Sequence, residues 1–168
     1  MPDRAVARSD APQSAALREA GLRVTVARVA VLQVLGEVPH ADTDTVIRRV
    51  QESLGAVSSQ AVYSVLAALV SAGLARRIEP AGSVPRYELR VADNHHHVVC
   101  RRCGAVADVD CAVGEAPCLN PSQTHGYRLD EAEVTYWGIC PGCQSNPSLD
   151  DQKVATSGPK IQVHKVNR

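Results

Sequence analysis

The chain has 168 residues, enough for one ordinary domain or two small ones, and its 18 basic and 18 acidic side chains exclude a uniformly basic or acidic binding protein. An apolar share of 45% excludes a wholly disordered chain, while four Tyr, one Trp and no Phe leave Ala, Val and Leu to build any core. A small domain whose core has few aromatic residues usually needs further stabilisation from a bound metal or disulfides. With no secretory signal or membrane span expected, the six cysteines are expected in the cytoplasm, where paired cysteines are more often metal ligands than disulfides.

Four short helices are predicted in the first half of the chain, each bounded by a capping residue or a glycine. The predicted ranges are 14–20 before Gly21, 25–35 before Gly36, a helix capped by Asp42 and ended by Gly55, and one capped by Ser58 or Ser59 and ended by Gly73. The second is expected to bury Val26, Val29, Ala30, Leu32 and Val34, and the third Val46, Ile47, Val50 and Leu54. Alternating segments 74–79 and 85–90, separated by Pro80-Ala-Gly-Ser83, predict a β-hairpin.

Short helices followed by a hairpin are typical of a winged helix-turn-helix domain, in which the fourth helix would enter the DNA major groove. Gln60, Tyr63 and Ser64 lie on the polar side of that helix near its start, where base edges are reached. Arg23 and Arg28 would supply phosphate contacts. A helical bundle with a hairpin and no role on DNA is the alternative. The pattern favours DNA binding, although the lack of Lys and Arg in the fourth helix weakens that interpretation.

Two Cys-x-x-Cys pairs in the second half, Cys100/Cys103 and Cys140/Cys143, predict a tetrahedral four-thiolate site for structural Zn²⁺. A thioredoxin-type redox pair is the alternative for Trp137-Gly-Ile-Cys140-Pro-Gly-Cys143, but little ordered chain is expected after it. A zinc deaminase is excluded because the sequence has no His-x-Glu motif. The remaining Cys111 and Cys118 are interpreted as small buried hydrophobes, with redox-sensitive thiols as the alternative.

The run His95-His96-His97 predicts a second metal site. On a strand, His95 and His97 share a face and His96 points away, and two imidazoles together suit Fe²⁺, Mn²⁺, Zn²⁺ or Ni²⁺. Ligands from other elements must complete the site, and His40, Glu88 and Asp108 have the right chemistry. A cation held by residues of both halves would fix the angle between them.

The distribution of charge divides the chain at the same place as the motifs. Residues 91–143 carry three basic and seven acidic side chains and all six cysteines, whereas residues 1–90 carry 11 and nine. We expect a flexible N-terminal tail over residues 1–13 and a winged-helix DNA-binding domain over 14–90. A hinge over 91–94 would lead to a metal-binding domain over 95–143 and a disordered C-terminal tail over 144–168. Lys153, Lys160, Lys165 and Arg168 in that last tail would add weak, non-specific attraction to DNA.

Taken together, these motifs resemble the ferric uptake regulator (Fur) family over residues 15–143. The resemblance rests on Gly21-Leu-Arg-Val-Thr25, Ala61-Val-Tyr63, Arg86-Tyr-Glu88, His95-His-His97, Cys100-x-x-Cys103-Gly104 and Cys140-x-x-Cys143. The run from Asp108 to Cys118 resembles the actinobacterial, peroxide-responsive branch of that family, which represses catalase-peroxidase genes.

The resemblance implies an α+β chain with an N-terminal winged helix-turn-helix domain and a small C-terminal α/β dimerisation domain containing a four-cysteine zinc site. It implies a homodimer that binds double-stranded DNA at an AT-rich inverted-repeat operator when metal is loaded. The four paired cysteines match the structural Zn²⁺ site, and the regulatory Fe²⁺ or Mn²⁺ site matches His40, Glu88, His95, His97 and Asp108. His96 and Glu115 match parts of a further metal site, for which Asn94 and Ala132 do not supply imidazoles. Ser64 stands where the family often has arginine.

We therefore expect a non-enzymatic, cytoplasmic transcriptional repressor that senses peroxide through bound Fe²⁺ and controls oxidative-stress and iron genes. One alternative is an iron-, zinc- or nickel-uptake regulator without peroxide chemistry, because this ligand set does not discriminate among those metals. Another is a thiol switch, in which oxidation of the zinc cysteines ejects the metal.

Overall fold

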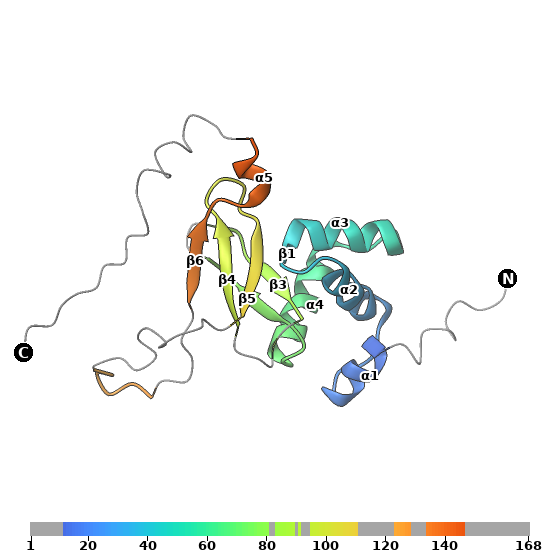
Figure 1. Ribbon diagram of the computed structural model, residues 1–168. Helices are drawn as coiled ribbons and strands as arrows, with labels where there is room; N and C mark the ends of the chain where they lie inside the picture. Colours follow the sequence, from blue (N-terminus) through green and yellow to red (C-terminus); the bar gives the residue numbers. More distant parts are fainter. Residues whose placement is uncertain are drawn as a thin grey trace, which may run out of the picture.

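The computed structural model describes residues 12–80, 83–89, 91, 95–110, 123–128 and 134–146. Figure 1 shows two groups of elements side by side: the helices α1–α4 with a first small sheet, and a second sheet followed by the short helix α5. The architecture is thus α+β, with the helical group first along the chain, as the sequence predicts.

The four predicted helices are present as α1 (Pro12–Glu19), α2 (Val26–Glu37), α3 (Thr43–Leu54) and α4 (Ser59–Ser71). The predicted caps are confirmed: Thr25 accepts from the Arg28 amide at 3.3 Å, Asp42 from Thr45 at 2.7 Å and Ser58 from Ala61 at 3.2 Å. Within the described residues no single helix has the length and apolar composition to cross a membrane. Helices α3 and α4 reach that length and composition only together, as a pair bent by 113°.

Three expectations about these helices are wrong. Helix α1 begins at Pro12, two residues before the predicted start, because proline suits the first turn of a helix. Pro12 and Gln13 are therefore helical and not part of a flexible tail. Helix α2 continues through Gly36 to Glu37, since the Val38 amide still bonds to the Val34 carbonyl at 2.8 Å. Val26, in the first turn of α2, is 52% exposed because it lies beyond the packed part of the helix.

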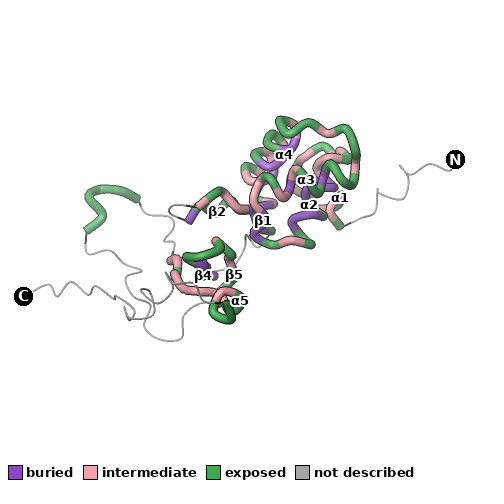
Figure 2. The backbone as a smooth tube through the Cα atoms, turned by 90° about the horizontal axis from the view of Figure 1, so that it is seen from above, coloured by how far each residue is buried: buried purple, intermediate pink, exposed green. Residues whose placement is uncertain are grey.

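The first sheet forms the wing. The predicted hairpin is present as β2 (Arg76–Ile78) and β3 (Arg86–Glu88), and a two-residue strand, β1 (Ala41–Asp42), pairs with the other side of β3 to give the order β1-β3-β2. The apolar core lies between this sheet and the inner faces of α1–α4, where Figure 2 shows the buried segments gathered. Ile47 and Leu54 pack against this core only in part.

The second sheet consists of β4 (His95–Cys100), β5 (Val106–Asp110) and β6 (Thr135–Gly138), followed by α5 (Pro141–Gln144). Strand β4 is central, antiparallel to β5 and parallel to β6. Among the described hydrophobic residues from 95 onward, only Val99 and Cys100 are fully buried. The described residues of this part therefore bury little apolar surface, which is the condition in which small domains depend on a bound metal or a disulfide.

Candidate metal centres and nucleic-acid face

The four paired cysteines meet at one end of the second sheet. Cys100 ends β4, Cys103 lies in the turn before β5, and Cys140 and Cys143 flank the start of α5. The parallel pairing of β4 with β6 aligns Cys100 with Gly138, and the Arg101 amide bonds to the Gly138 carbonyl at 2.8 Å. The two Cys-x-x-Cys turns, 37 residues apart, are thereby brought together.

The sulfur positions fit zinc. All four sulfurs lie within 4.8 Å of one another, and the Cys103–Cys140 distance is 3.7 Å. Four thiolates at the Zn–S distance of about 2.3 Å form a tetrahedron with edges of about 3.8 Å. A disulfide would need about 2.05 Å. These four cysteines are free, and their spacing suits a dication at the centre.

The electrostatics of the thiols point the same way. Burial raises the pKa of Cys100, but hydrogen bonds from the amides of Cys103, Cys140 and Arg102 outweigh it and lower this pKa to about 6. The Cys140 amide lies 3.3 Å from the Cys100 sulfur. A hydrogen bond with the Cys140 thiol raises the pKa of Cys143 to about 12. The easily ionised Cys100 thus stands in the same group as the protonated Cys143 thiol, and a dication would favour deprotonation of the whole set.

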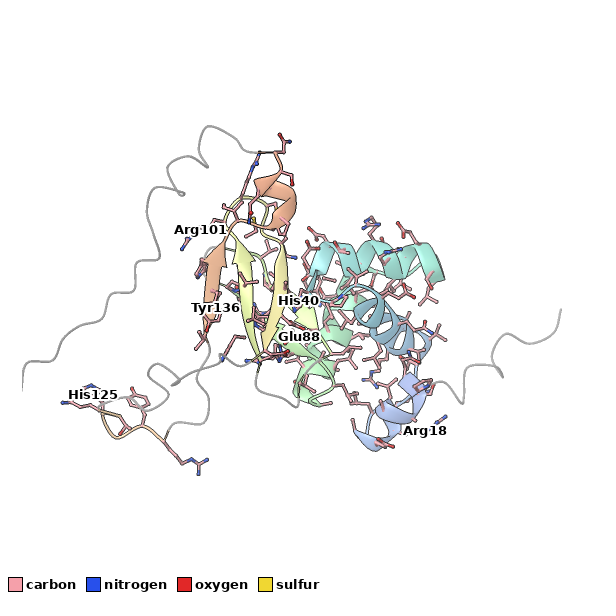
Figure 3. The ribbon with its side chains drawn as sticks, viewed as in Figure 1. Arg18, His40, Glu88, Arg101, His125 and Tyr136 are labelled. Atoms are coloured by element: carbon pink, nitrogen blue, oxygen red, sulfur yellow. The ribbon has the colours of Figure 1, made fainter. Side chains whose placement is uncertain are left out.

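The second group of candidate ligands lies at the junction of the two sheets. His40 occupies the turn between α2 and β1, Glu88 ends β3, and Figure 3 shows these two side chains close together beside the second sheet. His95 and His97 share the buried face of β4, and Asp108 on β5 pairs in register with His97. His40, Glu88, His95 and His97 are buried, whereas the Asp108 side chain is 31% exposed.

The donor atoms of His40, Glu88, His97 and Asp108 all lie within 4.8 Å of one another, and His95 lies beside this set in contact with His97 and Glu88. The Nε2 atom of His40 lies 3.0 Å from Glu88 Oε2 and 2.7 Å from Asp108 Oδ1, and His97 Nε2 lies 3.1 Å from the same Glu88 oxygen. Nε2 of His95 lies 3.2 Å from His97 Nε2 and 3.2 Å from Glu88 Oε1. Ligands about 2.1 Å from a common cation lie roughly 3.0 to 3.4 Å apart. Among the described residues, the buried Nε2 of His40 and Oε1 of Glu88 have no partner with hydrogen-bond geometry, so the donor set fits a metal better than a closed network.

In the absence of added metal, the charges of His40 and Glu88 depend on pH. Burial lowers the pKa of His40, but contact with Glu88 and the charge of Asp108 outweigh burial and raise it above 6.5. Burial raises the pKa of Glu88, but the close contact with His40 and the hydrogen bond with His97 outweigh burial and lower it below 4.5. The pair is therefore ionised between these two pKa values, in the metal-free protein.

Without added iron or manganese, we expect the free energy of unfolding to fall as the pH rises through the folded-state pKa of His40. A raised histidine pKa stabilises the fold below the unfolded value near 6.5, and this stabilisation is lost at higher pH because the buried carboxylate loses its cationic partner. Urea midpoints measured from pH 6 to 9 test this. His40→Asn should flatten the dependence, and a variant with the wild-type slope would contradict the assignment to His40.

Three of the five predicted DNA-contact residues line one groove of the first domain. Gln60, Tyr63 and Ser64 are exposed on α4 and line a groove of about 540 Å³, whose opposite wall is formed by Arg77 and Tyr87 of the wing. Arg23 is exposed, but Arg28 is half-buried and donates to the Arg23 carbonyl at 2.7 Å. The structure therefore places Arg28 as a support for Arg23.

Arg77 also lines this groove and was not predicted from the sequence. Its guanidinium lies 2.6 Å from Glu79, and half of the side chain is exposed. The only sequence signal is its place in the wing strand beside Arg76.

His96 lies apart from the ligand cluster and contacts the ring of Tyr136 on β6, with ring centroids 6.1 Å apart. The other candidate for a further metal site, Glu115, lies outside the described residues, as do Asn94, Ala132, Cys111 and Cys118. The hinge prediction falls largely outside them as well, because only Val91 of residues 91–94 is described.

The sequence profile of the ferric uptake regulator family matches residues 19–137. The chain is 64% identical over 127 residues to the transcriptional regulator FurA of Mycobacterium tuberculosis, covering 76% of this chain and 86% of that one. It is 59% identical over 139 residues to ferric uptake regulation protein 1 of Mycolicibacterium fortuitum, covering 83% and 86%. The solved structure of the ferric uptake regulator of Pseudomonas aeruginosa with manganese superposes with a TM-score of 0.57, at 25% identity, over 78% of this chain and 99% of that one.

Proposed function

Because this chain belongs to the ferric uptake regulator family of transcriptional regulators, we propose that it is a metal-dependent repressor in which one cation clamps the DNA-binding domain to the second domain. The observation that carries the proposal is the origin of the converging ligands. His40 and Glu88 come from the winged-helix part, and His97 and Asp108 come from the second sheet. His95, on the same strand as His97, contacts His97 and Glu88. A cation bound by both sets would favour one angle between the two parts.

We assign the four paired cysteines to structural Zn²⁺ and the His/Glu/Asp cluster to exchangeable Fe²⁺ or Mn²⁺. All four positions of the first site are thiolates from the chain, which is the closed arrangement of structural zinc. Imidazole and carboxylate donors suit Fe²⁺ and Mn²⁺, and the solved relative with manganese supports that choice.

The proposed DNA complex uses a homodimer. Two copies would present two α4 helices to successive major grooves, and their spacing would match an inverted repeat, which we propose to be AT-rich. Gln60, Tyr63 and Ser64 are exposed where base edges would be read. Arg77 lines the same groove and Arg23 is exposed, and we assign phosphate contacts to both. Metal at the interdomain cluster would set the separation of the two helices.

We further propose that the repressor senses peroxide when the exchangeable metal is iron and so controls oxidative-stress genes. When bound, Fe²⁺ supplies one-electron chemistry toward peroxide that Mn²⁺ does not supply under the same conditions. The oxidisable groups nearest that cation are imidazoles, and we assign the sensing role to His40 or His95. Loss of one ligand would release the clamp and the DNA.

Binding to a fluorescent AT-rich inverted-repeat duplex, measured by anisotropy with Fe²⁺ or Mn²⁺, tests the proposal. We expect both metals to promote binding over a scrambled duplex, and hydrogen peroxide to abolish it only with Fe²⁺. Mass spectrometry should then find one added oxygen atom on a peptide containing His40 or His95.

Other outcomes select the alternatives. Binding that survives peroxide with Fe²⁺ would indicate a metal-uptake regulator without peroxide chemistry. Binding lost to peroxide with Mn²⁺ loaded, together with zinc release, would indicate a thiol switch at the cysteines. Binding that is independent of metal would refute the repressor mechanism.

A further inference from the structure

His40 is the one of the five candidate regulatory ligands whose backbone is not held in a strand. The other four stand on strands, where backbone pairing fixes their direction, but His40 lies in a turn. Its φ is +58°, in the left-handed region that residues with a Cβ rarely adopt. A neighbouring group that holds the peptide of His40 would stabilise this conformation.

Arg86 provides that support. Its Nη1 donates to the carbonyl oxygen of His40 at 3.0 Å, across 46 residues of sequence. Arg86 lies two residues before Glu88 on β3, so both side chains share one face of the strand. It pairs in register with Asp42, two residues after His40. The sheet that carries the Glu88 ligand thus also carries the group that holds the His40 turn.

The same guanidinium lies against the Cys-x-x-Cys turn of the second domain. Gly104 follows Cys103 directly, and a Cβ placed on Gly104 would lie 3.5 Å from Nη2 of Arg86. The Gly104 amide closes that turn by bonding to the Cys100 carbonyl at 2.9 Å. One side chain therefore lies between the turn of His40 and the turn that holds half of the zinc ligands.

We propose that Arg86 is a positioning residue for the regulatory metal: braced against the Gly104 turn, its guanidinium holds the His40 peptide and so directs the His40 imidazole into the site. This inference rests on the proposed function, because it assumes that the cluster binds a metal. Arg86 does not touch the cation and acts only through His40. A planar guanidinium presents donors in two directions at once, which a lysine ammonium on a flexible stem does not reproduce.

The first test is Mn²⁺ affinity of the full chain carrying zinc, measured by electron paramagnetic resonance of the free ion. We expect Arg86→Met to weaken Mn²⁺ binding about tenfold, the size expected for loss of one hydrogen bond from a charged donor, with zinc content unchanged. Arg86→Lys should recover part of the affinity. The matched control is Arg48→Met, which removes an exposed arginine paired with Glu52 on α3 and should leave Mn²⁺ binding unchanged. Wild-type affinity in Arg86→Met, or loss of its zinc, would overturn the proposal.

The second test separates positioning from general destabilisation by a double-mutant cycle. If Arg86 acts through His40, Arg86→Met should have no effect on Mn²⁺ binding in a His40→Ala background and its full effect in a His95→Ala background. Equal effects in both backgrounds would overturn the proposal, because a merely structural role predicts them. If the wild-type chain itself does not bind Mn²⁺, the proposed function fails first, and the two failures are thereby distinguished.

Discussion

Replacing Cys100 with serine is expected to release the structural zinc and unfold the second domain while the winged-helix domain stays folded. Cys100 is the buried thiol of its site, and its sulfur accepts amide hydrogen bonds that hold its pKa near 6. Structural zinc contributes apparent free energies of about 10 to 16 kcal/mol to small domains at neutral pH. In the described second sheet only Val99 and Cys100 are buried hydrophobics, so these residues supply no contribution of comparable size. The first domain has its own core and should persist.

The single tryptophan makes this outcome directly measurable. Trp137 lies on β6, with Arg101 over its ring at 5.1 Å, and so its fluorescence reports on the second domain alone. Cys100→Ser should shift its emission toward that of an exposed indole, lose bound zinc and sediment as a monomer. Cys111→Ser is the matched control, because it removes a thiol outside both Cys-x-x-Cys pairs. A Cys100→Ser protein that is dimeric and fully loaded with zinc would refute the assignment of this cysteine.

The elements predicted well from the sequence were those determined by local chemistry. The caps at Thr25, Asp42 and Ser58 depend on residues three positions apart, and so a single stretch of chain carries the signal. The period of two in β4 likewise predicted which histidines share a face, and the structure buries His95 and His97 and leaves His96 half-exposed. The cysteine spacing predicted the convergence of two turns that are distant in sequence.

The features that were missed depend on contacts between distant segments. Strand β1 is two residues long and exists only because β3 offers it a partner. Gly36 stays helical, as the hydrogen bond from the Val38 amide to the Val34 carbonyl shows, and Leu89 packs 3.7 Å from where its Cβ would lie. Arg28 supports the Arg23 backbone, a role no periodicity reveals. At Gly36 the local pattern favours a helix end, and tertiary packing overrides it.

Strand β4 connects the two candidate metal sites. His95 begins β4 and Cys100 ends it. The four-cysteine zinc site therefore fixes one end of β4, and the buried face of the same strand carries the imidazoles of His95 and His97. Loss of zinc should therefore also remove the regulatory site, whereas loss of the regulatory metal should leave the cage intact. This asymmetry is what a structural site next to a sensing site requires, because the sensor must exchange metal without unfolding.

Replacing His97 with alanine is expected to abolish metal-activated DNA binding and leave the zinc in place. His97 is 1% exposed, and its Nε2 lies 3.1 Å from Glu88, 3.2 Å from His95 and 3.7 Å from Asp108. Removing a group that only orients a ligand typically weakens metal binding about 10- to 100-fold, and removal of a ligand should exceed that range. Mn²⁺ titrations followed by binding to the inverted-repeat duplex measure both effects.

Two further variants make the result specific to the imidazole. His97→Ala also leaves the buried Glu88 carboxylate with one partner fewer, which destabilises the fold by itself. His97→Gln retains an amide donor for Glu88 and lacks a good metal ligand, so it should fold, retain zinc and still lose Mn²⁺-dependent DNA binding. His125→Asn removes an exposed histidine whose left-handed backbone asparagine tolerates, and it should bind Mn²⁺ and DNA as the wild type does. If His97→Gln matches the wild type at every Mn²⁺ concentration, the cluster is not the regulatory site and the clamp between the two domains must lie elsewhere.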